Sequence, residues 1–196
     1  MLVFATNNPN KIAELQQQLG DRYRFRGLKD IGCTEEIPET TGTIPGNARQ
    51  KARHVHEHYG VDCFSEDTGL EIAALGGQPG VDTAHYAGPE RDAGANNRKV
   101  LSELKDRDDR RARFRTVICL ILDGKEHLFE GICPGRIAPQ PRGEGGFGYD
   151  PIFLPDGGNG RSFAEMSAAE KAAVSHRGRA VRALVEFLRD QPSGGA

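Results

Sequence analysis

The stretch Cys63-Phe64-Ser65-Glu66-Asp67-Thr68-Gly69-Leu70 organises the interpretation of the whole sequence. Apolar and small residues lead into two adjacent carboxylates, and the following Thr68-Gly69 predicts a turn, because glycine is common in turns. We expect a central strand over 61–66, this turn, and a second strand over 70–75. Taken alone, the acids fit an ordinary strand-to-turn junction better than a functional site, although acids at the end of a buried strand carry a solvation cost.

Length, net charge and composition limit the class of protein. The chain has 196 residues and a formal net charge of −2, which predicts one domain over 1–190 and a disordered tail over 191–196. It lacks the basic excess of nucleic-acid binding proteins, and no apolar run approaches the roughly 18 residues that span a membrane. The N-terminus does not resemble a signal peptide. The four cysteines have no C-x-x-C or zinc spacing, which predicts reduced thiols in a cytoplasmic protein; they are Cys33, Cys63, Cys119 and Cys133.

The N-terminal segment predicts a strand, a polar loop and a helix. Leu2 to Ala5 is a compact apolar run, and Thr6-Asn7-Asn8-Pro9-Asn10-Lys11 follows at once. Asn8 suits an N-cap and Pro9 the first helical position, and Gly20 suits the stop. The free N–H groups at such a helix start favour an anion, and Lys11 adds a full positive charge. The segment lacks the G-x-x-x-x-G-K-[ST] pattern of a Walker loop.

Two further helices are predicted, one in the first half of the chain and one across its centre. One runs from Asn47 to Tyr59, and the other from Asp92 to Lys105. His54 and His58 lie one turn apart on the first of these helices. Without an H-E-x-x-H pattern, we interpret them as a solvent-facing stripe rather than a metal site. The three acids of the preceding loop, which include Glu39, are of the kind that is usually solvated.

The second half predicts a hairpin, a glycine loop and two helices. The hairpin joins 114–122 to 126–133 through Asp123-Gly124. Residues 143–148 match G-x-G-x-x-G, but no strand precedes them and no helix follows, so we reject a dinucleotide site. Ser167 and Glu170 form a capping box, and Ser175 is a second candidate cap. The final helix has an apolar stripe at Ala180, Val181, Leu184, Phe187 and Leu188.

The polar segments share one chemical theme. Glu39, Glu66 and Asp67 offer hard oxygen ligands of the kind that Mg²⁺ and Mn²⁺ prefer. Lys171, His176 and Arg177 offer cations near a helix start, and Phe147 offers a stacking face. Together with the anion-binding loop at 6–11, these groups suggest a nucleoside triphosphate on a metal ion. By composition alone this remains a conjecture, since charged loops are common.

The order of the motifs carries more information. The sequence closely resembles the inosine triphosphate pyrophosphatase family from residue 2 to about residue 188, with five motifs in the family's order. These motifs are Ala5-Thr6-Asn7-Asn8-Pro9-Asn10-Lys11, Glu66-Asp67-Thr68-Gly69-Leu70, Leu75-Gly76-Gly77-Gln78-Pro79-Gly80-Val81, Gly146-Phe147-Gly148-Tyr149-Asp150-Pro151, and Phe163-Ala164-Glu165-Met166 through Glu170-Lys171 to Ser175-His176-Arg177-Gly178.

The resemblance implies a fold, an activity and a set of site residues. The implied fold is mixed α/β, with a long twisted central sheet flanked by helices and two lobes with an active-site cleft between them. The implied activity is hydrolysis of non-standard purine nucleoside triphosphates by a homodimer, with one Mg²⁺ per subunit and Mn²⁺ as a possible substitute. The implied ligands are Glu39 and Asp67 for the metal, Asp67 also being catalytic, and Thr6, Asn7, Asn8, Pro9, Asn10, Lys11, Thr68, Phe147, Gly148, Tyr149, Asp150, Lys171, His176 and Arg177 for substrate.

The chemistry suits these residue types. Water would attack the α-phosphorus, pyrophosphate would leave, and a carboxylate would orient or deprotonate the water. The ligand and base roles compete at Asp67, and Glu66 is the alternative for one of them. Donors from His176 and Arg177 would pair with a 6-oxo group and not with the amino group of adenine. The same chemistry does not explain how GTP is rejected.

The chain departs from the family's pattern at three positions, one of which is Glu66, where many members have Asp. Three rival functions also fit parts of the sequence. The family usually has Tyr and Arg where this chain has Asp82 and His85, which leaves the role of that Arg in doubt. Asp67-Thr68-Gly69 also occurs in aspartic proteases, but those need two such triplets on an all-β scaffold. A related pyrophosphatase for modified pyrimidine or ordinary triphosphates is the second rival, and a nucleotide-binding regulator without turnover is the third.

Overall fold

The computed structural model describes residues 1–192, apart from the side chain of Asn10. Within it the chain forms two compact units, each made of separate segments. Unit 1 comprises 1–67, 117–130 and 180 onward, and unit 2 comprises 68–116 and 131–179. The predicted tail over 191–196 lies outside the described residues from 193 on. The single domain expected over 1–190 stays a prediction.

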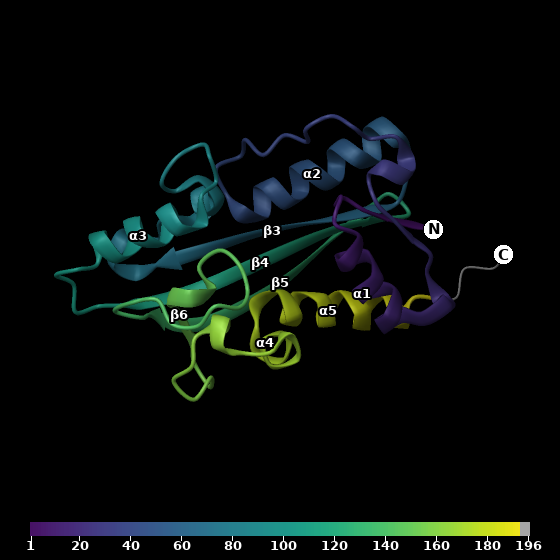
Figure 1. The fold of residues 1–196 in the computed structure, drawn as a ribbon. Helices are drawn as coiled ribbons and strands as arrows, with labels where there is room; N and C mark the ends of the chain where they lie inside the picture. Colours follow the sequence, from purple (N-terminus) through teal and green to yellow (C-terminus); the bar gives the residue numbers. More distant parts are fainter. Residues whose placement is uncertain (193–196) are drawn as a thin grey trace. The chain divides into compact units, whose positions relative to one another are not determined.

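Unit 1 contains three neighbouring strands and the helices that cover them (Figure 1). Strand β1 (Leu2–Phe4) pairs in parallel with β2 (Phe25–Arg26) and with the start of β3 (Cys63–Ile72). Helix α1 (Pro9–Leu19) and the C-terminal part of α5 (His176–Asp190) pack their apolar side chains on these strands. The stacked rings of Phe4 and Phe64, 4.4 Å between centroids, lie within this core.

The helices of unit 1 begin and end at the signals in the sequence. α1 starts at Pro9 and is followed by Gly20 at φ 57°, as predicted. α2 (Ile44–Tyr59) starts three residues earlier than predicted, because the Thr43 side chain caps it by accepting the N–H of Gly46 at 3.0 Å. Gly60 ends α2 in the left-handed conformation. Ala48, Ala52 and Val55 lie on one face of α2 and are fully buried.

The predicted turn at Thr68-Gly69 is wrong. β3 runs without interruption from Cys63 to Ile72, and Gly69 has no positive φ. Leu70 and Ile72 are fully buried, so the strand continues to supply core residues after the acids. Burial of these apolar side chains in the sheet outweighs the local preference of glycine for a turn. The predicted second strand over 70–75 ends at residue 72, and a short 3₁₀ turn, Ala73–Leu75, follows.

Unit 2 contains the parts of β3, β4 (Arg111–Leu122) and β5 (Lys125–Ile137) that do not belong to unit 1. It holds α3 (Ala93–Glu103), β6 (Phe153–Pro155), α4 (Ala168–Val174) and the first residues of α5. β6 pairs antiparallel with β5 (Lys125–Ile137), for example Arg136 with Leu154. Its separate core includes Leu70, Phe114, Phe153 and Phe163. The Asp92 side chain caps α3 by accepting the N–H of Ala95 at 2.9 Å, so the helix begins one residue after its predicted start and ends at Glu103, before the predicted end at Lys105.

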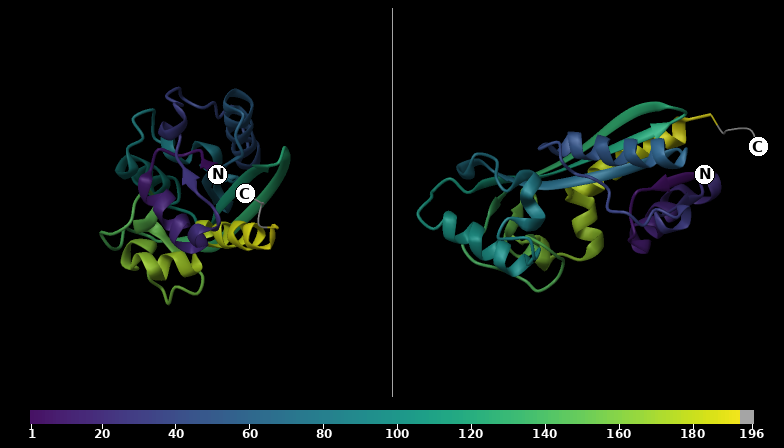
Figure 2. Two further views of the ribbon diagram at one scale, coloured as in Figure 1. Left: turned by 90° about the vertical axis from the view of Figure 1, so that its right-hand side faces the viewer. Right: turned by 90° about the horizontal axis from the view of Figure 1, so that it is seen from above.

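The predicted hairpin and caps of the second half are confirmed. β4 (Arg111–Leu122) and β5 are long neighbouring strands (Figure 2). The turn between them is Asp123-Gly124, and both of these residues have positive φ. Ser167 and Glu170 form the capping box of α4. The Ser175 hydroxyl accepts the N–H of Gly178 at 3.0 Å, so that α5 begins one residue after α4 has ended.

The strands form a six-stranded sheet in the order β2-β1-β3-β4-β5-β6, with both parallel and antiparallel pairs. This is the mixed α/β fold that the resemblance implied. The four cysteines are buried and unpaired, as predicted. Among residues 1–192, no helix is long and apolar enough to cross a membrane.

Candidate active site

Three predicted carboxylates of unit 1 gather around two lysines. The Lys51 ammonium lies 2.6 Å from Glu39 Oε1 and 3.8 Å from Asp67 Oδ1, and it donates to the Glu66 carbonyl at 2.7 Å. Lys11 forms an ion pair with the Glu66 carboxylate. We call these five residues the carboxylate cluster. It brings Glu39, which the sequence placed in a loop of uncertain role, to the same ammonium as Asp67.

The continuity of β3 explains how the two adjacent acids are divided. Successive side chains of a strand point to opposite faces of the sheet. Ser65, whose hydroxyl donates to Ala48 of α2 at 2.5 Å, shares a face with Asp67, and Lys51 of the same helix lies beside Asp67. Phe64 shares the other face with Glu66, which meets Lys11 of α1. Glu66 and Asp67 are therefore neighbours in sequence that serve opposite sides of one strand.

Lys51 was not predicted from the sequence. Its side chain is 14% exposed, although lysine is almost never buried unless it is paired. The signal was its place beside Ala48, Ala52 and Val55 on the apolar face of α2. A lysine that borders an apolar helical face and follows an acidic loop is a candidate for a charged site.

The predicted phosphate loop lies at the start of α1 in the same unit. The Thr6 hydroxyl accepts the N–H of Asn8 at 3.1 Å, which shapes the loop before the helix. Asn7, Asn8 and Pro9 are exposed, and Lys11 is partly buried with its ammonium on Glu66. The backbone of Asn10 belongs to the first turn of α1. These positions suit a loop that receives an anion from solvent.

The carboxylate cluster fits a divalent cation by the chemistry of its donors. Its three carboxylates exceed its two ammonium groups by one negative charge, and hard carboxylate oxygens are the ligands of Mg²⁺. Within residues 1–192, no three His, Cys, Asp or Glu side chains are arranged to hold a metal ion. Glu39 and Asp67 both lie against the ammonium of Lys51 instead.

Unit 2 contains a pocket of about 340 Å³, a volume suited to a small ligand group. Its lining includes many of the predicted substrate residues: Thr68, Phe147, Gly148, Tyr149, Asp150, Lys171 and His176. Thr68 and Thr116 join their hydroxyls at 2.8 Å. Thr68 directly follows Asp67 in the chain, so the pocket and the carboxylate cluster are supplied by consecutive residues of β3.

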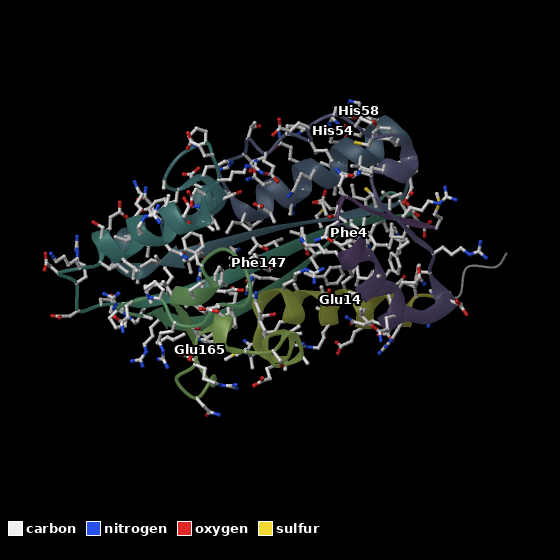
Figure 3. The ribbon with its side chains drawn as sticks, in the orientation of Figure 1. Phe4, Glu14, His54, His58, Phe147 and Glu165 are labelled. Atoms are coloured by element: carbon white, nitrogen blue, oxygen red, sulfur yellow. The ribbon has the colours of Figure 1, made fainter. Side chains whose placement is uncertain are left out.

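Asp150 organises the glycine loop beside the pocket. Its buried carboxylate accepts the N–H of Phe147 at 3.0 Å and the Lys171 ammonium at 2.6 Å. Gly146 has φ 71°, and a Cβ there would lie 2.1 Å from Asp150 Oδ2, so only glycine allows this closure. The Phe147 ring, labelled in Figure 3, is 78% exposed and carries the Lys171 ammonium 4.3 Å from its centroid.

His176 is neutral, and its description as a cation is corrected. Burial lowers its pKa to about 3, and the charges of Lys171 and Arg177 act in the same direction. The imidazole stacks on Phe114 at 4.6 Å between centroids. Its Nδ1 is buried and has no hydrogen-bond partner among the described residues. A neutral imidazole with an unused nitrogen can pair with a polar edge of a ligand.

The remaining predictions have mixed outcomes. Arg177 lies in the first turn of α5, next to His176, and is not among the residues that line the pocket. His54 and His58 stack at 4.1 Å on α2 (Figure 3), with His54 on Glu35, as a surface pair without further metal ligands in the described part. Some residues that line the pocket belong to no motif used for the prediction and were missed: Thr83, Ala84, Arg91, Asn96 and Phe114.

The fold and these two groups of residues define a class of protein. A mixed α/β chain with an anion-binding loop, a carboxylate–lysine cluster and a pocket with aromatic walls is equipped to bind a phosphorylated ligand with a flat ring. Similarity to known proteins makes the assignment specific. The chain belongs to the Ham1 family, whose model matches residues 2–187, and this confirms the resemblance that the motifs indicated.

Relatives match over nearly the whole chain. A dITP/XTP pyrophosphatase of Flavobacterium psychrophilum is 52% identical, over 96% of this chain and 99% of its own length. One of Christiangramia forsetii is 54% identical, over 95% and 98%. The solved structure of a HAM1 protein from Coxiella burnetii superimposes with a TM-score of 0.92 at 38% identity, covering 97% of this chain and 98% of that one.

Proposed function

We propose that the chain hydrolyses the non-standard purine nucleoside triphosphates ITP, dITP and XTP to the monophosphate and pyrophosphate, which removes them from the nucleotide pool. The observation that carries the proposal is the meeting of Glu39 and Asp67 at Lys51, in a chain about half identical to enzymes named dITP/XTP pyrophosphatase. The loop Thr6–Lys11 of unit 1 offers groups that suit phosphate, and the pocket of unit 2 offers groups that suit a flat base.

The triphosphate is received by the start of α1 and by the lysines of the carboxylate cluster. The N–H groups of the first helical turn and the Lys11 ammonium attract the phosphate oxygens. As phosphate displaces Lys11 from Glu66, the ion pair of the free protein is exchanged for one with substrate. This exchange avoids leaving either charge unpaired in a partly buried site.

Asp67 is the residue proposed to activate water. Its carboxylate orients a water molecule toward the α-phosphorus and accepts the proton that the water loses. The ammonium of Lys51 lies 3.8 Å from this carboxylate. The Asp67 carboxylate, and not that of Glu66, shares the Lys51 ammonium with Glu39, which supports Asp67 for the catalytic role.

Glu39 and Asp67 are the proposed ligands of one Mg²⁺, with Mn²⁺ as a substitute. When bound, the ion would neutralise phosphate charge that develops as pyrophosphate leaves. The carboxylate cluster supports this assignment by its donor chemistry. A homodimer is a further expectation from the resemblance, and light scattering on the purified chain tests it. A cytoplasmic location is the expectation from the four reduced cysteines.

The pocket of unit 2 is proposed to hold the base. Phe147 offers a ring face, and the loop Gly148–Asp150 forms the adjoining wall. Neutral His176 supplies one donor and one acceptor for the edge of the purine. Arg177, one residue further on in α5, is proposed as a further donor to the 6-oxo group of the base.

The rival functions are less well supported. An aspartic protease needs an all-β scaffold with two acid triplets, whereas this fold is mixed α/β. A nucleotide-binding regulator without turnover would not need two carboxylates, Glu39 and Asp67, placed on one lysine. A pyrophosphatase for pyrimidine or ordinary triphosphates differs in base selection, and a substrate panel distinguishes it.

The test is pyrophosphate release from ITP, XTP, dITP, ATP, GTP and dUTP. We expect fast release from the first three and at least about 100-fold lower kcat/KM for ATP. Asp67→Asn should lower kcat by about 10³-fold or more with little change in melting temperature. Glu126→Gln is the matched control, because that carboxylate pairs with Arg49 and Arg53 outside the carboxylate cluster. Comparable rates on ATP, or turnover by Asp67→Asn, would refute the proposal.

A further inference from the structure

One wall of the pocket in unit 2 is held rigidly in place. The Thr83 hydroxyl accepts the N–H of Leu70 at 2.9 Å and donates to the Gly80 carbonyl at 2.6 Å. The Tyr149 hydroxyl donates to the Thr83 carbonyl at 2.7 Å. Buried Asn96 accepts the N–H of Ala87 at 2.7 Å and donates to the Ala84 carbonyl at 3.0 Å. A ligand in this pocket therefore meets a fixed surface.

Arg91 stands out on that wall. It lines the pocket, its side chain is exposed, and its backbone has φ 55°, in the left-handed region. Asp123 and Asn159, which also have positive φ, are of the types that tolerate this conformation, whereas an arginine there is strained. Glycine would occupy the position at lower cost. Strained residues of this kind cluster at ligand sites.

The charge of Arg91 is not matched by any protein group in the described residues, where it forms no hydrogen bond or ion pair. Several arginines of unit 2 are paired: Arg113 with Glu71, Arg142 with Glu165, and Arg161 with Glu170. Lys171, which also lines the pocket, is held by Asp150. Neutral His176 adds no charge. Among the described residues that line this pocket, Arg91 is thus the cation that remains available to a ligand.

The guanidinium selects ligands by hydrogen-bond type. It carries five N–H donors and no acceptor. The oxo groups of hypoxanthine and xanthine accept such donors, but the 6-amino group of adenine presents donors of its own. A donor that meets a donor is left unpaired, and the ligand binds more weakly. Chemically, an unpaired arginine at a base-sized pocket favours oxo-purines.

We propose that Arg91 is a specificity-determining residue, whose guanidinium donates hydrogen bonds to the oxo groups of a purine held in the pocket of unit 2. The inference rests on the proposed function and adds a residue to it. Several observations point to a ligand contact. Arg91 lines the pocket, the neighbouring wall is fixed by hydrogen bonds, the φ of Arg91 is positive, and its guanidinium has no partner among the described residues.

The experiment compares three proteins: wild type, Arg91→Gly and the matched control Arg98→Ala. Arg91→Gly removes the guanidinium and suits the backbone angle, so it should fold with an equal or higher melting temperature. Arg98→Ala removes the same charge from an exposed position on α3 that does not line the pocket. The readouts are kcat/KM for ITP, XTP and ATP, and calorimetric binding of inosine and adenosine monophosphates.

For Arg91→Gly we expect kcat/KM for ITP and XTP to fall about 10-fold or more, mainly through KM, while ATP changes less than about 2-fold. Binding of inosine monophosphate should weaken by a similar factor, and that of adenosine monophosphate should not. Arg98→Ala should match wild type on every ligand. Equal losses on ITP and ATP would show a phosphate contact or a general field effect, and unchanged selectivity would show no contact; either result overturns the inference.

The two proposals fail separately. If wild type releases no pyrophosphate from any oxo-purine triphosphate, the proposed function fails. The monophosphate binding of wild type and Arg91→Gly then decides the role of Arg91 without turnover. If wild type is selective and Arg91→Gly keeps that selectivity, only the role of Arg91 fails.

Discussion

At the level of single residues, the carboxylate cluster depends on Lys51. Its ammonium lies between Glu39 and Asp67, which would repel one another without it. Under the proposed function, a bound divalent cation would replace this lysine as the partner of the two carboxylates.

Lys51→Met tests this account without measuring turnover. Loss of the ammonium should destabilise the fold by about 1–2 kcal/mol, because the largely buried Asp67 carboxylate loses its partner, while the exposed Glu39 contributes less. Added Mg²⁺ should then raise the melting temperature more in Lys51→Met than in wild type. Arg53→Met, which removes a cation paired with Glu126 on the same helix, is the control. An equal Mg²⁺ effect in Lys51→Met and wild type would contradict the account.

His176 makes the stability depend on pH in a defined direction. Its pKa is about 3 in the folded chain against an ordinary value of 6.5, so between these values the unfolded chain binds a proton that the folded chain does not. Stability should therefore fall as pH falls from 6.5 toward 3, by about 1 kcal/mol per pH unit from this residue. Above pH 6.5 the contribution is constant.

Urea unfolding followed by circular dichroism at about pH 7 and about pH 4.5 measures the effect. The difference in unfolding free energy between wild type and His176→Asn should shift by about 2–3 kcal/mol in favour of the variant at the lower pH. Taking the difference between the two proteins removes the shared contribution of other titrating groups. A difference that does not change with pH would mean that the imidazole is not kept neutral by burial.

At the level of elements, the junction of α4 and α5 positions both Lys171 and His176. The two helices meet at Ser175, and Gly178 follows in the first turn of α5. A Cβ at Gly178 would lie 2.0 Å from the carbonyl oxygen of Ala172, which is backbone and cannot move aside cheaply. The close approach of the helices therefore requires glycine.

Gly178→Ala should destabilise the fold by about 2–4 kcal/mol, because the overlap forces the helices apart. Gly94→Ala in α3 is the matched control, since its Cβ would meet only the flexible Arg98 side chain and the Asp92 carboxylate at 3.1 and 3.2 Å. The higher helix propensity of alanine offsets that contact, so its melting temperature should change little. Equal melting temperatures for the two variants would contradict the close packing.

The sequence predicted elements well where local signals and the fold agree. Pro9, Gly20 and Ser167 mark helix ends that depend on neighbouring backbone groups, and each was predicted correctly. Thr68-Gly69 was predicted wrongly, because burial of the following strand residues outweighs the turn preference of glycine. The start of α2 was missed by three residues, since Thr43 was not interpreted as its cap.

The candidate site residues that belong to motifs were predicted from the sequence, and those outside any motif were missed. The resemblance supplied Asp67, Glu39 and the pocket loop, because these residue types recur in a fixed order. Lys51 and Arg91 became visible only through the distances and backbone angles of the folded chain. The neutral state of His176 depends on burial, which sequence spacing does not report.

At the level of the whole molecule, three strands and one helix run through both units. β3, β4, β5 and α5 each start in one unit and end in the other. Because these elements cannot unfold in one unit while staying intact in the other, we expect the single domain predicted from the sequence. Calorimetry should give one transition with equal calorimetric and van't Hoff enthalpies, whereas two resolved transitions would contradict a single domain.

The central claim is that water attacks the α-phosphorus of oxo-purine triphosphates in preference to ATP. The most direct measurement offers the protein an equimolar mixture of ITP and ATP with Mg²⁺ in ¹⁸O-labelled water, and analyses the products by mass spectrometry. We expect inosine monophosphate with one ¹⁸O, unlabelled pyrophosphate and almost intact ATP. Label in pyrophosphate or in inorganic phosphate, or adenosine monophosphate formed as fast as inosine monophosphate, would contradict the claim.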